Sequence, residues 1–143
     1  AFYIGGTKCG ALFGEAVVFP KPGTCPRFVT WMKQQGALLA KGRITGLQFE
    51  TLMEENRYVE YGAKAVRLAE KLREGLKEKG YQLVYNSTTN QTFVKVTDDW
   101  YETYRNNIGM SFWEKADDCH TIVRLATSWA TTEEEVDALL TLV

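Results

Sequence analysis

The clearest periodic pattern of the chain lies between residues 58 and 79, where small or apolar side chains recur every three or four positions. These recurring residues are Gly62, Ala65, Ala69, Leu72 and Leu76. Charged residues occupy the other faces, so the pattern predicts an amphipathic helix. Gly80 follows two lysines and marks the C-terminal end of this helix.

Shorter apolar runs bounded by turn residues predict the remaining elements. Before the long helix we expect strands at residues 2–4 and 16–19 and a helix from residue 28 to about 36. Glycines at 36, 42 and 46 should divide or kink the helical segment that follows. After the long helix the predicted strands are 82–85, 92–96, 110–113 and 121–127, and the predicted helices are 98–106 and 133–140.

The order of these elements predicts an α/β fold whose second half is an α+β layer, a small mixed or antiparallel sheet covered by helices. Thr132 and Glu135 form a capping box that starts the last helix. The 143 residues suffice for one compact domain or the larger part of one. Because an apolar strand begins almost at the first residue, Ala1, we expect an upstream part to be absent.

Composition narrows the functional classes. The net charge of −1 provides no basic field for nucleic acid or an anionic membrane, and no apolar run has the length of a membrane span. The three cysteines are odd in number and lack metal-ligand spacing, which indicates thiols in a reducing compartment, and we expect the cytoplasm. Neither a metal, a nucleic acid nor a membrane is an expected partner.

The loop after the first strand carries a candidate nucleophile. Lys8 follows Thr7 and lies among glycines that permit close approach of the backbone. A lysine of lowered pKa attacks an aldehyde as the free amine, and a neighbouring hydroxyl can bind a phosphate oxygen. The alternative is a surface lysine on a glycine loop, and the spacing of a Walker phosphate loop is missing.

Arg124 is the second candidate, because it lies in an apolar strand with no acidic neighbour. The period of a strand places Val123 and Leu125 on one face and Arg124 on the other, where it needs an anion from elsewhere. A substrate carboxylate is one solution, and a structural ion pair or an exposed sheet face is the other. His120, the one histidine, and Cys9 are interpreted as structural residues.

Three segments in order resemble the threonine aldolase and aromatic amino acid β-eliminating lyase family, which uses pyridoxal phosphate on the fold-type-I scaffold. Residues 2–14, with Thr7 and Lys8, resemble the lysine segment of the family. Residues 89–96 resemble its first small-domain strand, and residues 122–127 with the capped helix resemble its closing strand and helix. The resemblance covers this whole chain but only the C-terminal part of a family member.

The resemblance implies a role for each matching residue. Lys8 would form the Schiff base with pyridoxal 5′-phosphate, Thr7 would lie beside the cofactor phosphate, and Arg124 would bind the substrate α-carboxylate. In relatives a basic residue from a neighbouring subunit also contacts the cofactor. Lys41 is its match here, although residues 36–39 depart from the arginine-bearing pattern. The phosphate-binding glycine loop and the partners of the pyridine ring belong upstream in this family.

The resemblance further implies that residues 1–50 are the end of the large cofactor-binding domain with a linking helix, and that residues 51–143 are the small C-terminal domain. The implied activity is cleavage of a β-hydroxy-α-amino acid to glycine and an aldehyde, in a homodimer or homotetramer. The chain alone is expected to be inactive without its missing N-terminal portion. The alternatives are a β-eliminating lyase or an aminotransferase of the same fold, or a non-catalytic interaction domain.

Overall fold

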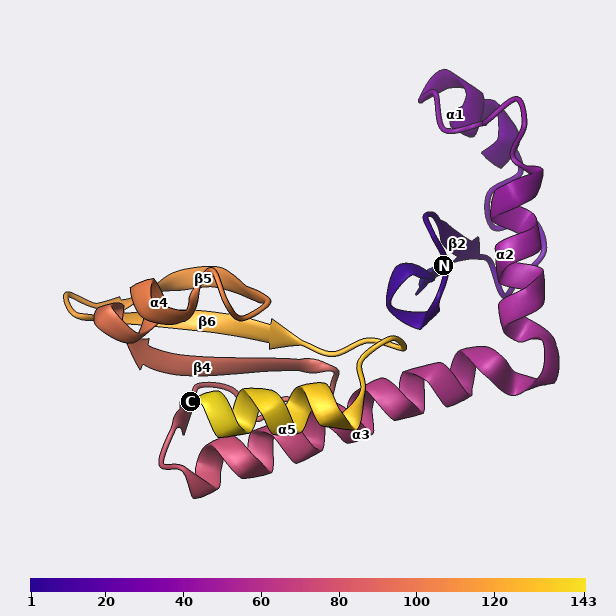
Figure 1. The fold of residues 1–143 in the computed structure, drawn as a ribbon. Helices are drawn as coiled ribbons and strands as arrows, with labels where there is room; N and C mark the ends of the chain where they lie inside the picture. The colour runs from indigo at the N-terminus through magenta and orange to yellow at the C-terminus, as the bar shows by residue number, and fades with distance from the viewer. The chain divides into compact units, whose positions relative to one another are not determined.

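A computed structural model describes all 143 residues and shows two compact units, residues 1–60 (unit 1) and residues 61–143 (unit 2). The structure combines helices and strands (Figure 1), which agrees with the predicted α/β class. None of the helices combines the length and the apolar content that crossing a membrane requires.

Unit 1 begins with a short antiparallel pair of strands. β1 (Phe2–Gly5) pairs with β2 (Glu15–Val18), and a single 3₁₀ turn, η1 (Thr7–Cys9), begins the loop that joins them. Helix α1 (Phe28–Gln34) and helix α2 (Arg43–Met53) follow, and the short 3₁₀ segment η2 is Glu54–Asn56. Gly36 adopts a φ of 67°, which few other residues tolerate, so the predicted interruption after residue 36 is confirmed. Gly46 was expected to interrupt the helical segment as well, but it lies within α2.

The long predicted helix is α3 (Arg57–Glu78), which agrees with the sequence pattern to within one residue at each end. It stops, as predicted, just before Gly80, whose φ is 86°. The amide of Gly80 donates to the carbonyl oxygen of Lys77 at 2.9 Å, and the amide of Tyr81 donates to that of Leu76 at 2.9 Å. These two bonds satisfy carbonyl groups that the end of a helix leaves free.

Unit 2 contains a four-stranded sheet with the strand order β3-β4-β6-β5, and every neighbouring pair is antiparallel. The strands are β3 (Gln82–Leu83), β4 (Gln91–Thr97), β5 (Met110–Asp117) and β6 (His120–Ala126). β3 is shorter and β5 is longer than the sequence predicted. β5 is an edge strand with two register shifts, so its exposed polar residues show no regular alternation.

Two further helices belong to unit 2, α4 (Asp98–Tyr104) and α5 (Glu133–Leu142). The predicted capping box of α5 is present, since Thr132 and Glu135 exchange hydrogen bonds of 2.9 and 3.2 Å. Helices α3 and α5 run side by side along the sheet (Figure 1). The core between them and the sheet includes the fully buried side chains of Leu68, Leu76, Val94 and Val123.

Candidate functional site

The lysine loop of unit 1 has a defined conformation. The amides of Cys9 and Ala11 both donate to the carbonyl oxygen of Gly6, at 2.9 and 3.0 Å, which closes the turn that contains Lys8. Thr7 and Lys8 are exposed, whereas the Cys9 side chain is buried, as expected for this thiol. The turn therefore exposes the Lys8 amine and the Thr7 hydroxyl and buries the Cys9 thiol on its inner side.

Tyr58, at the start of α3, anchors the same loop. Its hydroxyl donates a hydrogen bond of 2.8 Å to the carbonyl oxygen of Gly5 and also contacts the Cys9 thiol. Burial raises the pKa of the Cys9 thiol, and burial together with Cys9 raises the pKa of Tyr58. Both groups thus stay protonated at neutral pH, and the Tyr58 hydroxyl remains a donor to the backbone immediately before the turn.

Gln48 of α2 holds the far side of the loop. Its side-chain oxygen accepts a hydrogen bond of 2.6 Å from the amide of Leu12, and its side-chain nitrogen donates to the carbonyl oxygen of Phe13 at 3.5 Å. Sequence reasoning identified neither Gln48 nor Tyr58, because each is separated from its partner by more than 30 residues. Only the fold brings them to the loop.

Gly6 is required for space rather than for an unusual backbone angle. A Cβ atom added to Gly6 would lie 2.6 Å from the Cβ of Ala11 and 3.1 Å from the Cζ of Phe49. A Cβ atom added to the neighbouring Gly5 would meet nothing within 4 Å. The backbone just before Thr7 is therefore packed directly against its own loop and against α2.

This contrast gives a matched pair of substitutions. We expect Gly6→Ala to lower the free energy of unfolding by about 1–3 kcal/mol, because the added methyl overpacks the loop, and to displace the turn that carries Lys8. Gly5→Ala should change stability by less than about 0.5 kcal/mol. Urea unfolding monitored by circular dichroism measures both. Equal effects of the two substitutions would contradict the packing described for Gly6.

Arg124 lies in β6 on the face opposite Val123 and Leu125, as predicted, and these two residues are buried in the core. Its guanidinium donates weak hydrogen bonds to Gln91 Oε1 at 3.4 Å and to Ser111 Oγ at 3.3 Å. Its Nε atom is buried and has no partner. No ion pair involves this arginine. It therefore retains donor capacity for an anion.

Two aromatic side chains neighbour Arg124 on this face: Phe93, its cross-strand partner in β4, and Trp113. The ring centroid of Phe93 lies 5.1 Å from that of Tyr85 and 5.0 Å from that of Trp113. The Arg124 guanidinium lies over the Trp113 ring, 5.7 Å from its centroid. Trp113 stands at a register shift of β5, between Phe112 and Glu114, and strand periodicity alone does not predict its direction. The Trp113 ring thus covers one side of the guanidinium.

The candidate residues are divided between the two units. Thr7 and Lys8 belong to unit 1, and so does Lys41, which is exposed in the turn before α2. Arg124 belongs to unit 2. The structure thus provides an accessible amine beside a hydroxyl in one unit, and a guanidinium without an acidic partner in the other. An amine suits condensation with an aldehyde, and a guanidinium suits a carboxylate.

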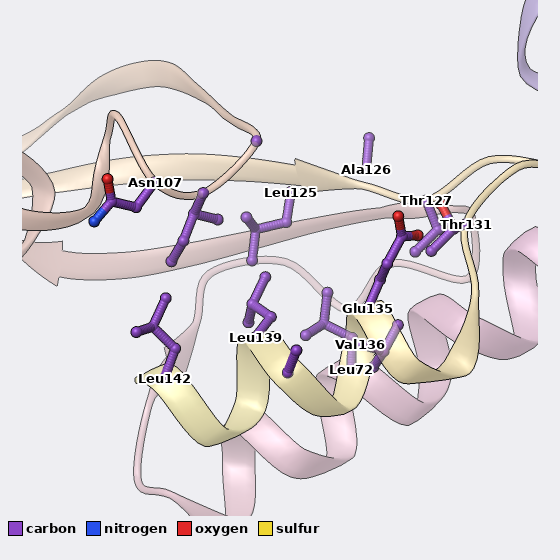
Figure 2. Close-up of a pocket in the computed structure, with 13 residues that line it drawn as sticks. Leu72, Asn107, Leu125, Ala126, Thr127, Thr131, Glu135, Val136, Leu139 and Leu142 are labelled. Carbon is purple, nitrogen blue, oxygen red and sulfur yellow. The ribbon is translucent and has the colours of Figure 1, made fainter.

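A cavity of about 490 Å³ in unit 2 involves none of these candidates. It lies between α5 and the end of β6, where Leu125, Val136 and Leu139 point into it and Glu135 stands at one end (Figure 2). The Glu135 carboxylate already accepts a hydrogen bond from the Thr132 amide in the capping box. The cavity is a gap at the edge of the core.

Comparison with known proteins identifies similar structures. The chain superimposes on a solved structure of Leishmania major threonine aldolase with a TM-score of 0.88 and 38% sequence identity, over 99% of this chain and 41% of that one. It thus spans about two fifths of the length of that enzyme. A Sphingomonas wittichii serine palmitoyltransferase matches with a TM-score of 0.62 and 14% identity, over 82% of this chain and 33% of that one, which shows the fold alone. No protein-family model and no curated protein sequence matches.

Proposed function

Because the chain belongs to the threonine aldolase family and corresponds to the C-terminal portion of a member, we propose that it contributes to the active site of a pyridoxal-phosphate-dependent lyase. The family has the type I fold of pyridoxal-phosphate enzymes. The substrate class would be β-hydroxy-α-amino acids, cleaved to glycine and an aldehyde. The observation that carries the proposal is the match to a threonine aldolase at 38% identity over 99% of the chain.

In this proposal the residues of unit 1 hold the cofactor. Lys8 provides the amine that condenses with its aldehyde, and Thr7 provides a hydroxyl for its phosphate. Lys41 provides a cation for the phosphate of a neighbouring subunit's cofactor. The exposed amine and hydroxyl on a loop fixed by Tyr58 and Gln48 fit these roles. When bound, pyridoxal phosphate supplies an electron-accepting ring for the electrons of the broken bond.

Arg124 would bind the α-carboxylate of the amino acid. Its two weak contacts with neutral groups, at 3.3 and 3.4 Å, can give way to stronger charge-assisted bonds with a carboxylate. The Trp113 ring over the guanidinium keeps water from one side of it, which strengthens such a pair. A carboxylate fixed in this way orients the bond to be broken relative to the cofactor ring.

The domain organisation is part of the same proposal. Residues 1–50 would be the end of the large cofactor-binding domain with its linking helix, and residues 51–143 would be the small domain. The structure also divides into two compact units, with the boundary at residue 60 instead of residue 50. The remaining cofactor contacts would come from an N-terminal portion of the same protein, in a homodimer or homotetramer. The three unpaired cysteines support a reducing, cytoplasmic location.

Two other functions use the same residues. A β-eliminating lyase or an aminotransferase of this fold would also need Lys8 and Arg124, so the choice of reaction depends on pocket groups outside this chain. A non-catalytic interaction domain would need neither residue. The unpaired Nε of Arg124 favours the enzyme, because a structural arginine ordinarily has its buried donors satisfied.

The test of the proposal is covalent labelling of the full-length protein. Incubation with pyridoxal phosphate, reduction with borohydride and peptide mapping should find one modified lysine per chain, at Lys8. The exposed Lys21 of the same unit serves as the internal control and should remain unmodified. A protein without a reducible adduct at Lys8 would exclude the whole proposal, including its aminotransferase and β-elimination variants.

A further inference from the structure

The turn between β5 and β6 brings together three side chains of different chemistry. Asp117 ends β5 and His120 begins β6, and the two residues are paired across the hairpin. Cys119 stands between them in the turn. One potential ligand atom from each residue lies within 4.8 Å of the other two. This cluster belongs to unit 2 and contains none of the residues assigned above.

We propose that Asp117, Cys119 and His120 form a binding site for a divalent transition metal, with Zn²⁺ as the fitting ion. The Cys119 sulfur lies 3.5 Å from Asp117 Oδ1 and 3.5 Å from His120 Nδ1. Tetrahedral zinc with bonds of about 2.3 Å to sulfur and about 2.0–2.2 Å to nitrogen and oxygen separates such ligand atoms by about 3.6 Å. Two edges of the ligand triangle therefore already have the required length.

The third edge is the one that must change. His120 Nδ1 and Asp117 Oδ1 are 2.7 Å apart because they share a proton in a hydrogen bond. A metal bound between them would separate them to about 3.4 Å. The movement of about 0.7 Å that follows from these bond lengths lies within the rotation of two partly exposed side chains. The backbone of the hairpin can stay in place.

The hairpin is held in the conformation that the site needs. The Cys119 amide donates to Asp117 Oδ1 at 3.1 Å, and the Asp98 amide donates to the Cys119 carbonyl oxygen at 3.0 Å. Lys95 binds the other carboxylate oxygen, Oδ2 of Asp117, at 2.8 Å. Since Lys95 occupies Oδ2, Oδ1 is the oxygen that faces the thiol and the imidazole. Such outer contacts orient the ligands of metal sites.

Nearby cations do not cancel the charge of the site. Lys115 forms an ion pair with Asp98, so these two charges offset each other. Asp117 and a Cys119 thiolate together supply two negative charges, and Lys95 opposes one of them. Metal binding replaces the thiol proton, which passes to solvent, and moves the imidazole proton from Nδ1 to Nε2. A set of one sulfur, one nitrogen and one oxygen ligand favours Zn²⁺ over Mg²⁺ or Ca²⁺ and leaves a fourth position for water.

The spacing of the ligands explains why the sequence did not predict the site. The motif is Asp-Asp-Cys-His, whereas zinc motifs recognised by spacing contain repeated Cys or His pairs. The sequence was consistent with His120 as a structural residue and with cysteines that lack ligand spacing. Here the pairing of β5 with β6, and not sequence periodicity, brings the aspartate beside the imidazole.

The experiment is a zinc titration of the intact protein after treatment with a chelator, in competition with a chromophoric zinc indicator. The wild type should bind one Zn²⁺ per chain. Cys119→Ser and Asp117→Asn should each weaken binding by at least about tenfold, since even outer contacts of metal sites change affinity by this much. Asp118→Asn and Cys25→Ser are matched controls that remove a neighbouring carboxylate and a distant thiol, and both should bind as the wild type does.

A second measurement separates loss of a ligand from loss of folding. Co²⁺ added to the wild type should give a thiolate-to-metal charge-transfer band, and Cys119→Ser should lack this band while its far-ultraviolet circular dichroism stays unchanged. Absence of stoichiometric zinc binding in the wild type, or a cobalt band that persists in Cys119→Ser, would overturn the proposal. Neither readout depends on pyridoxal phosphate or turnover, so the result stands apart from the test of Lys8.

Discussion

Full-length protein with Lys8→Ala is expected to lose turnover of β-hydroxy-α-amino acids by at least about a thousandfold, as removal of a covalent catalytic group commonly does. No other lysine lies in the turn of residues 7–9, and this turn is fixed by hydrogen bonds from Cys9 and Ala11 to Gly6. A remote amine therefore cannot take the place of Lys8 at the cofactor aldehyde. Steady-state assay of aldehyde release measures the effect.

The matched control for this variant is Lys21→Ala, which removes an exposed lysine from a loop of the same unit. It should retain wild-type turnover and the borohydride-reducible adduct. Lys8→Ala should keep the circular dichroism and urea midpoint of the wild type, because its side chain is exposed. Substantial turnover by a well-folded Lys8→Ala protein would remove Lys8 from the catalytic role.

The sequence predicted those elements whose signals are local. The boundaries of α3 followed from its apolar spacing and from Gly80, and the start of α5 followed from the capping box of Thr132 and Glu135. These features depend on side chains three or four positions apart, which helical geometry brings into contact without help from the rest of the fold. Strand alternation, which is also local, correctly placed Arg124 on the face opposite Val123 and Leu125.

Features that depend on contacts between distant segments could not be predicted in this way. The length of β5 depends on pairing with β6 through two register shifts, and no local pattern encodes such shifts. The anchoring of the lysine loop by Tyr58 and Gln48 joins residues separated by 53 and 36 positions. The candidate residues Lys8 and Arg124 were visible from local chemistry, whereas the contacts that fix their surroundings required the fold.

Arg124→Ala in the full-length protein is expected to weaken binding of the amino acid substrate by about 2–4 kcal/mol, the cost expected when a charge-assisted pair loses one of its members. This corresponds to an increase in KM of about 30-fold to 900-fold. The adduct at Lys8 should be unaffected, because Arg124 lies in the other unit and is assigned to the substrate. Arg124→Lys should recover part of the affinity, since it keeps the charge but not the planar pair of donors.

Arg105→Ala is the control for Arg124→Ala, because Arg105 has the acidic partner that Arg124 lacks. Arg105 also lies near an aromatic ring, 6.0 Å from the centroid of Tyr101, but it forms an ion pair of 3.1 Å with Glu102. Unlike Arg124 it already has an acidic partner, and its removal should leave KM unchanged. If Arg124→Ala and Arg105→Ala behaved alike, the free donors of Arg124 would have no substrate carboxylate to bind. Arg124 would then be a packing residue of the sheet face, held by Gln91, Ser111 and Trp113.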